Sequence, residues 1–398
     1  MNIQENKEFE RLSRRVFLKR LGGAVLVISV AGLAWRMIDQ GVFSTGKGPA
    51  YEAWNSSKDN LESGPLALVN DAILASNPHN TQPWLFKVTD SFIEIYADES
   101  RNLGAFDPMR REMFIGLGCA IENMMLSANA HGYNPKLIYK PSITEPDCIA
   151  RIDLTPGAKK DSPLYQEIPH RHTHRGKYDT DRQISKSILA DIKNLIADEK
   201  KVKISWITST EEKKKVGDSI VEATEAIIAD EEMSAETNKW FKENWKDIQE
   251  QRDGITLDAQ GSSFLIRMLG KILPPMSHER NDQFWLSSTE SVHTATAATY
   301  GIVSIRDSSD KEQLARAGRA WQRIHLYGTK LGLGMQPLNQ VHEMADRELV
   351  LGTSEHFGTE LKNIVGDASW KGIFTFRCGY PLKETHPSPR RAIRDVIL

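Results

Sequence analysis

A run of basic side chains near the middle of this 398-residue chain has the residue types and spacing to bind an anion. In an extended segment alternate side chains point to the same face, so Arg171, Thr173 and Arg175 can converge on one ligand. The forked N–H donors of arginine match the oxygens of a phosphate group. Near the C-terminus, Arg390 and Arg391 can bring further charge. The pattern predicts a phosphate-binding site, with a solvated polar loop as the alternative.

Three histidines interleave with these residues and raise the alternative of a metal site. His170, His172 and His174 occupy every second position, so they can also share one face of an extended segment. No carboxylate or cysteine accompanies them within the run. We therefore predict no metal here.

The composition excludes several classes of protein. The chain has 51 Lys and Arg against 53 Asp and Glu, a net charge of −2, and so lacks the basic excess of a general nucleic-acid binder. Hydrophobic residues make up 40% and charged residues 26%, which is typical of soluble globular proteins and not of disordered or multi-span membrane proteins. Cys119, Cys148 and Cys378 lack a CxxC spacing, which argues against a disulfide scaffold or a zinc cage.

The elements that must position the basic run can be predicted from the apolar spacing. Apolar residues at three- and four-residue intervals predict helices over 65–74 and 110–131, and a further helix is expected over 185–196. Strands are predicted over 85–88 and 92–97, where the second segment alternates apolar and other residues. A strand pair therefore lies between the first two helices.

One segment of the chain is repeated. Residues 118–132 align with residues 318–332, and the identical pairs are Gly118/Gly318, Ala120/Ala320, Leu126/Leu326 and Gly132/Gly332. Each segment predicts a helix with small residues on one face, which permits the close approach of another helix, and with a glycine after its last turn. The alignment indicates either a coincidence or an internal duplication.

The first forty residues have the pattern of a targeting signal. Ser13-Arg14-Arg15-Val16-Phe17-Leu18-Lys19 is followed by an uncharged stretch over 21–35, and the arrangement resembles a twin-arginine signal. An ordinary N-terminal anchor or a buried helix is the alternative. Fifteen uncharged residues are fewer than the roughly 20 needed to cross a bilayer comfortably, and no clean cleavage site follows. Cleavage and retention as an anchor both stay open.

Four blocks of the chain together resemble the nitroreductase superfamily. The loop 77–84 resembles its Asn-Thr-Gln-Pro-Trp loop, and the segment 168–179 resembles the Arg-x-Ser/Thr-x-Arg/Lys segment that opens that fold. The segment 332–340 resembles the loop that faces the flavin ring, and 374–381 together with 388–391 resembles the tail. The opening segment here follows the Asn-Thr-Gln-Pro-Trp loop. That order is similar to the Acg-like branch, whose single chain resembles a fused nitroreductase dimer.

The resemblance implies FMN as the cofactor. Asn80 and Gln82 offer amides that suit the pyrimidine edge of the ring, and main-chain groups of Leu338 and Asn339 are assigned to the flavin N5. We expect Trp84 to belong to the core and not to stack on the ring. No catalytic residue is expected, because the flavin carries the chemistry. The implied cofactor-binding residues are Arg171, Thr173, Arg175, Pro78, His79, Asn80, Gln82, Pro337, Leu338, Asn339, Arg390 and Arg391.

The implied fold is α+β, with helices around a mixed or antiparallel sheet, present twice in one chain as a fused pseudo-dimer. Each half keeps only part of the binding set, so one composite flavin site is expected and its mirror site is degenerate. An aromatic-rich insertion is predicted as either a helical subdomain with its own core or a functional lid. The predicted divisions are a signal or anchor (1–40), a linker (41–62), a first half (63–160) and a second half (161–398) with the insertion at about 230–295.

The function implied is that of an exported FMN-dependent oxidoreductase, which reduces a quinone- or nitro-like organic acceptor. The alternative is a protein that binds or sequesters FMN without turnover, with the insertion covering the flavin. Export by the Tat translocase places the protein in the periplasm, or anchored on the membrane outside the cytoplasm. We expect a membrane quinol or an electron carrier as the electron source. We also expect a monomer and no nucleic-acid partner.

Overall fold

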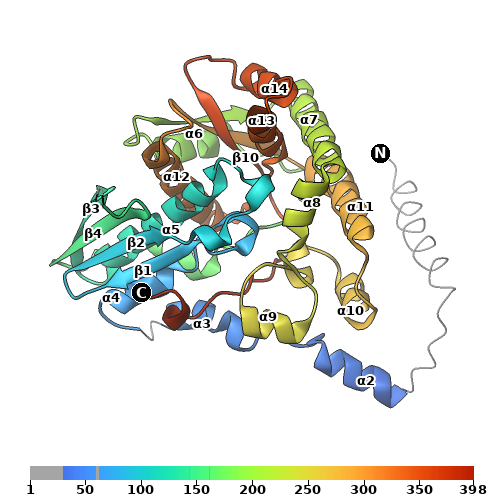
Figure 1. Cartoon of the computed structure of the whole chain (residues 1–398), viewed down its shortest axis with the longest axis horizontal. Coiled ribbons are helices and arrows are strands. Elements are labelled where there is room, and N and C mark those ends of the chain that lie inside the picture. Colours follow the sequence, from blue (N-terminus) through green and yellow to red (C-terminus); the bar gives the residue numbers. More distant parts are fainter. Residues whose placement is uncertain (1–29, 60–61, 143, 161) are drawn as a thin grey trace.

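The computed structural model describes residues 30–59, 62–142, 144–160 and 162–398 (Figure 1). The predicted signal motif at 13–19 lies outside the described residues, and so does most of the uncharged stretch that follows it. The end of that stretch forms the first turns of α2 (Val30–Asp39). Within the described ranges, no helix is both long enough and apolar enough to span a membrane.

Two four-stranded antiparallel sheets form the framework of the fold. The first sheet contains β1 (Trp84–Val88), β2 (Phe92–Ala97), β4 (Cys148–Pro156) and β3 (Tyr133–Tyr139), in that spatial order. The second contains β5 (Val202–Ile207), β8 (Thr299–Ile305), β10 (Lys371–Gly379) and β9 (Gly334–Pro337). In both sheets the spatial order is first, second, fourth, third. The predicted α+β class with antiparallel sheets is confirmed.

A long helix follows the second strand of each sheet. These helices are α5 (Arg111–Ala130) and α12 (Lys311–Lys330), and they pack against each other at the centre of the molecule (Figure 1). They cross at the repeated glycines. A Cβ atom on Gly118 would lie 2.0 Å from the carbonyl oxygen of Ala315, and one on Gly318 would lie 2.0 Å from that of Ile115. Only glycine fits at either position, which confirms the prediction of a close helix approach.

One apolar core runs through both sheets and the central helices. Trp84 of β1 is fully buried in it, as expected, and so are Trp321 of α12 and Phe376 of β10. The aromatic rings of Trp321 and Phe376 lie 4.6 Å apart. Since the core joins the two sheets into one body, residues from distant parts of the sequence are held in fixed relation.

A large insertion separates the first two strands of the second sheet. It begins with α7 directly after β5, so it spans 208–298 and not only the predicted 230–295. Because α7 has the apolar and polar spacing of an ordinary surface helix, its sequence does not mark it as inserted. The elements of the insertion are α7 (Thr210–Ala229), α8 (Glu231–Asn238), β6 (Phe241–Lys242), α9 (Trp245–Gln251), β7 (Ile255–Thr256), η6 (Leu257–Gln260), α10 (Phe264–Ile272), α11 (His278–Ser288) and η7 (Thr289–Thr294).

The segment predicted as a linker, 41–62, contains folded structure. It includes η1 (Pro49–Tyr51) and α3 (Glu52–Lys58), and it buries Tyr51 and Trp54. The glycines and serines of this segment are typical of a linker, but its two buried aromatic residues provide an apolar surface that packs on the core. The other helices are α4 (Pro65–Ala72), η2 (Pro78–Asn80), η3 (Glu99–Arg101), η4 (Gly104–Phe106), η5 (Tyr165–His170), α6 (Lys186–Asn194), α13 (Gln340–Leu351), α14 (His356–Val365) and η8 (Ile393–Asp395).

The C-terminal tail crosses from the second sheet to the first. Beyond β10 the chain runs to the edge of β1, where the Phe86 N–H donates to the Val396 oxygen at 2.7 Å and the Leu398 N–H donates to the Phe86 oxygen at 2.9 Å. The crossing carries Arg390 and Arg391 toward the loop that precedes β1 (Figure 1).

Candidate functional site

Two adjoining cavities lie where the 77–84 loop, the central helices and the insertion meet. The larger has a volume of about 880 Å³ and the smaller about 20 Å³. Both are lined by Ser76, Asn77, Thr173 and Arg175, so the small cavity extends one end of the large one. A polar recess is thereby joined to a chamber of ligand size.

Three arginines surround the small cavity. The Arg171 guanidinium donates to the Leu74 oxygen at 2.9 Å and lies 3.4 Å from Nδ1 of His325. Arg390 donates to the amide oxygen of Asn80 and to the oxygens of Leu74 and Ala75. Arg175 donates to a main-chain oxygen of the insertion at 3.2 Å. These partners are neutral groups.

The charges of these arginines are uncompensated. No carboxylate among the described residues lies within 4.0 Å of Arg171, Arg175 or Arg390. Burial is the main cause that lowers the pKa of Arg171 and Arg175 to about 10 and also lowers the pKa of Arg390. A neighbouring cation adds to each shift: Arg175 acts on Arg171, Arg377 on Arg175, and Arg171 on Arg390. Buried Nε atoms of Arg171 and Arg390 lack any hydrogen-bond partner. Because buried charge without a counter-ion is costly, the recess is built for an anion.

Two aromatic residues complete this recess. Trp54, from the segment predicted as a linker, places its ring 4.8 Å from the Arg390 guanidinium and 4.5 Å from the ring of His172. Burial, together with Arg171 and Arg390, lowers the pKa of His172 well below its usual value, so the ring is neutral. Its Nδ1 is buried without a partner. A neutral histidine adds a hydrogen-bonding group without adding charge.

The histidines of the basic run do not form a metal site in the described structure. His174 bonds through Nε2 to the Lys383 oxygen, and His170 is exposed. The groups of three candidate ligand atoms found among the described residues lie elsewhere and include none of these histidines.

The 77–84 loop has an unusual backbone. His79, Asn80 and Gln82 have φ angles of 46°, 58° and 54°, in the left-handed region that non-glycine residues seldom adopt. The insertion and the tail hold this conformation, because the Gly254 N–H donates to the Asn80 oxygen at 3.1 Å and the Asn80 amide donates to the Pro389 oxygen at 2.9 Å. Such strained backbone is found at functional loops.

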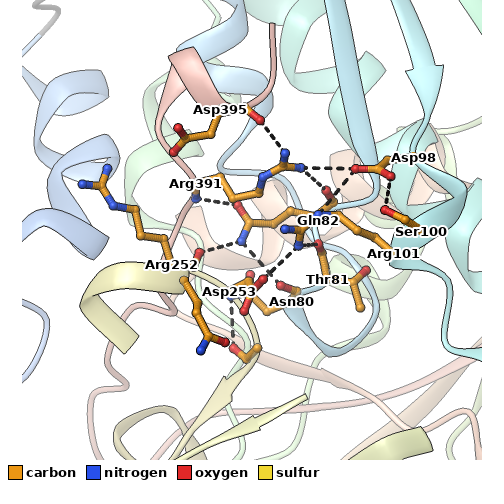
Figure 2. Close-up of polar contacts among 12 residues, drawn as sticks. Asn80, Thr81, Gln82, Asp98, Ser100, Arg101, Arg252, Asp253, Arg391 and Asp395 are labelled. Carbon is orange, nitrogen blue, oxygen red and sulfur yellow. Dashed lines mark hydrogen bonds and ion pairs between the residues drawn. The ribbon is translucent and has the colours of Figure 1, made fainter. Parts of the chain in front are cut away.

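Figure 2 shows that Gln82 and Arg391 are hydrogen-bonded to each other and link this loop to the C-terminal tail. The Gln82 amide donates to the Arg252 oxygen at 2.8 Å, and its side-chain oxygen accepts from the Arg391 N–H at 2.8 Å. Arg391 also donates to the Gln82 main-chain oxygen at 3.2 Å and lies 3.8 Å from Asp98. Neither residue lines either cavity. The structure uses both to join loop, insertion and tail, in contrast to the predicted cofactor contacts.

The other predicted site residues lie at the cavities. The small cavity is lined by Arg171, Asn80 and Arg390, in addition to Thr173 and Arg175, which line both cavities. The large cavity is lined by Pro78, His79, Pro337, Leu338 and Asn339.

The structure shows the state of a polar group in two of these residues. Main-chain groups of Leu338 and Asn339 were assigned to the flavin N5, and the Leu338 N–H here donates to the Thr375 oxygen at 2.8 Å. The pKa of His79 falls to about 3 through burial and the nearby Arg175, so this ring is neutral. His79 therefore adds no charge to the wall of the large cavity.

The sequence did not reveal an acidic pair on the wall of the large cavity. Glu112 of α5 and Glu343 of α13 are both buried and both line it. Burial, and then the neighbouring Glu112, raises the pKa of Glu343 well above its usual value, and one of its oxygens has no partner. The Asn339 amide donates to Glu112 at 2.8 Å. Burial therefore favours the protonated form of Glu343 on this wall of the cavity.

The insertion supplies the apolar part of the large cavity. Leu265, Ile266 and Leu269 of α10 line it, as do Met276 and Phe284. The chamber thus runs from a cationic recess at one end to an aliphatic and aromatic wall at the other.

Comparison with curated proteins gives partial matches. No protein-family model matches the chain. Over 135 residues it is 30% identical to "Putative NAD(P)H nitroreductase Rv3131" of Mycobacterium tuberculosis (strain ATCC 25618 / H37Rv), a match that covers 33% of this chain and 38% of the relative. Over 85 residues it is 29% identical to "Putative NAD(P)H nitroreductase acg" of the same strain, covering 21% and 26%. The chain thus spans well under half the length of these relatives.

Part of the chain is thus similar to proteins named as nitroreductases, one of them acg, in agreement with the resemblance of the sequence motifs. Among solved structures, the chain is similar to the FMN-dependent nitroreductase NfnB of Mycobacterium smegmatis in complex with NADPH, at 10% identity and a TM-score of 0.37, over 58% of this chain and 96% of that one. A nitroreductase with bound FMN from Bacteroides fragilis matches at 15% identity and a TM-score of 0.32, over 56% and 94%.

Proposed function

We propose that this protein is an FMN-dependent oxidoreductase of the nitroreductase type, which reduces an organic acceptor such as a quinone- or nitro-like molecule. The observation that carries the proposal is the recess of Arg171, Arg175 and Arg390, which has no carboxylate partner among the described residues and opens into a chamber of about 880 Å³. The nitroreductase names of the curated relatives support the reaction class.

The residues present fit this cofactor. A phosphate monoester carries about −1.5 to −2 charges at neutral pH, which the three guanidinium groups can balance. The Nε atoms of Arg171 and Arg390, two residues that line the recess, are buried and have no hydrogen-bond partner among the described residues. The adjoining chamber lies within the usual range of ligand pockets, and its wall suits a flat aromatic ring system.

When bound, FMN supplies reversible electron transfer, so the protein needs no nucleophile of its own. The arginines bind and orient the phosphate end. The apolar side chains of α10 and α11 exclude water from the chamber. Glu343 lies on the wall, and its burial favours the protonated form, so it can supply the proton that an acceptor requires when it takes up electrons.

The same proposal includes a fused pseudo-dimer with one composite site. Both sheets have the same strand order, and each has its long helix after the second strand, which supports a duplication with halves at 63–160 and 161–398. The 77–84 loop would come from the first half, and the segments 171–175 and 337–339 from the second.

Export is also part of the proposal. The motif at 13–19 supports recognition by the Tat translocase and a periplasmic or membrane-anchored location. Cell fractionation of the full chain tests this. Replacing Arg14 and Arg15 together with Lys should leave the protein in the cytoplasm, whereas unchanged export of that variant would contradict a twin-arginine signal.

The principal experiment is an absorption spectrum of the purified full chain, followed by anaerobic reduction and exposure to quinone and nitro compounds. Oxidation of the reduced flavin by an acceptor, repeated over many cycles, supports the enzyme. A second candidate is a protein that holds FMN without turnover, favoured by the large share of the chamber wall that the insertion provides. Bound flavin that no acceptor oxidises would support it, and a chain without flavin affinity would contradict both.

A further inference from the structure

Helix α10 buries a charged residue and leaves large apolar residues exposed. Lys271 is buried and donates to Asp258 at 2.6 Å, and Arg267 lies 3.3 Å from the same carboxylate. The apolar residues Phe264 and Leu265 are each 50% exposed instead. A surface helix of a soluble protein usually buries its apolar stripe. Part of the apolar surface of α10 is therefore left without a protein partner.

The exposed apolar surface continues onto α2. Trp35 and Ile38 of α2 are 65% and 73% exposed. The ring of Phe43, just beyond α2, lies 6.4 Å from that of Phe264, and Lys271 of α10 also donates to the Gly41 oxygen at 3.1 Å. Figure 1 shows α2 and α10 side by side at one end of the molecule. We name this surface the α2–α10 face, made up of Leu33, Trp35, Ile38, Phe43, Phe264, Leu265 and Ile266.

The α2–α10 face borders the large cavity. Leu265, Ile266, Met276 and Phe284 are exposed at the surface and also line the chamber. The same apolar side chains therefore connect the interior of the cavity with the outside of the protein.

We propose that the α2–α10 face docks on a lipid bilayer, with the cavity opening toward the membrane. Contiguous exposed apolar patches of this kind mark protein or membrane contacts. The chain before α2 favours the membrane, because its uncharged stretch 21–35 leads directly into this face and is preceded by Arg14, Arg15, Lys19 and Arg20. Apolar residues beside a basic cluster suit the acyl and anionic headgroup layers of a bilayer. Trp35 also has the side chain that prefers this interface.

Docking in this way defines the class of acceptor. A lipid-soluble molecule such as a quinone could pass from the bilayer along Leu265 and Ile266 into the chamber without crossing water. This part of the inference rests on the proposed function, whereas the docking itself does not depend on bound flavin.

Fluorescent probes at single cysteines test the docking directly. The native cysteines, Cys119, Cys148 and Cys378, are buried, so an introduced surface cysteine can be labelled selectively. We choose Ile38→Cys on α2 and Phe264→Cys on α10. The matched control is Val350→Cys, a residue that is 51% exposed near the end of α13. Figure 1 shows α13 well apart from α2 and α10.

Each labelled full-length variant is mixed with vesicles of phosphatidylcholine and phosphatidylglycerol that carry a quencher on the acyl chains. We expect a blue shift and strong quenching at positions 38 and 264 and little change at position 350. Equal quenching at all three positions, or none at any, would overturn the proposal. Emission at 38 and 264 that is already blue-shifted without vesicles, and unaffected by them, would show that the chain covers its own face, and would overturn it too. Flavin content, measured on the same samples, tests the proposed function separately.

Discussion

The guanidinium groups of Arg171 and Arg390 donate to the same carbonyl oxygen, that of Leu74, at 2.9 and 3.4 Å. One arginine follows η5 and the other lies in the C-terminal tail, so the fold brings two cations from distant segments onto one neutral acceptor. Burial, and then repulsion from Arg171, lowers the pKa of Arg390 well below its usual value. Two buried cations without a counter-ion are costly for the empty protein. A bound anion would balance their charge, so the arrangement indicates an anionic ligand.

Removing two of these charges should empty the site. In the double variant Arg171→Ala, Arg175→Ala, each lost charge-assisted contact weakens FMN binding by about 1.5–3 kcal/mol, or roughly a hundredfold in Kd for the pair at the least. Fluorescence titration of flavin-free protein measures this. Arg391→Ala is the control, because Arg391 lines neither cavity. It should bind FMN within a few-fold of the parent while unfolding at a lower temperature. Full flavin occupancy in the double variant would remove the phosphate assignment.

The glycine crossing of the central helices should be intolerant of any side chain. Gly118→Ala places a Cβ atom 2.0 Å from a carbonyl oxygen, so α5 and α12 must separate, at a cost of about 3 kcal/mol in the free energy of unfolding. Gly358→Ala on α14 is the matched control, since its Cβ would meet no atom closer than 3.6 Å. That variant should be neutral or stabilised by about 0.5–1 kcal/mol. Urea denaturation distinguishes the two, and equal stabilities would contradict the packing described.

Stability should fall as the pH rises from about 4 to about 6, through Asp71. Burial raises the pKa of this carboxyl to about 6, although Ser57 and Ser127 donate to it. Between the unfolded value near 3.8 and the folded value, the native protein holds a proton that the unfolded chain has released, so each rise in pH favours unfolding. The loss amounts to about 3 kcal/mol and levels off above pH 6.

Asp71→Asn removes this ionisation and should flatten the profile over that range. The free energy of unfolding, measured in urea at several pH values, gives the comparison. Asp90→Asn, at an exposed carboxyl, serves as the control and should follow the parent. A parent protein whose stability rises between pH 4 and 6, with Asp71→Asn parallel to it, would contradict the assignment.

We predict the electron donor from the proposed location outside the cytoplasm and not from the names of the relatives. Outside the cytoplasm a nicotinamide pool is not expected, so NADH and NADPH should reduce the flavin slowly and a quinol analogue faster. Anaerobic stopped-flow traces of flavin bleaching measure both rates on the same preparation. Rapid, saturable bleaching by micromolar NADPH would contradict a membrane or protein donor.

Much of the framework could be predicted because it depends on local pattern. The helix expected over 110–131 is found at 111–130, and the strand expected over 92–97 is found at those residues. The repeated glycines also indicated the close packing of α5 and α12, since small residues at matching positions let two helix backbones approach each other.

The remainder depends on long-range contacts that local pattern does not encode. Gln82 matches the flavin loop of the family, but its amide is used by Arg252 and Arg391, from segments far away in the sequence. Trp54 was expected to lie in a polar linker, yet the tail returns to cover it, with its indole N–H donating to the Ser388 oxygen at 2.8 Å. In the sequence Glu343 cannot be told from an ordinary polar position of a helix. Its raised pKa depends on burial and on Glu112, which α5 places beside it.

The amount of flavin released per chain tests the central claim most directly. The full chain is purified natively, unfolded, and its released FMN is quantified against protein. One composite recess, formed by Arg171, Arg175 and Arg390, predicts a ratio near one. A ratio near two would contradict the single composite site, and a chain that neither retains nor takes up FMN would contradict the proposed function itself.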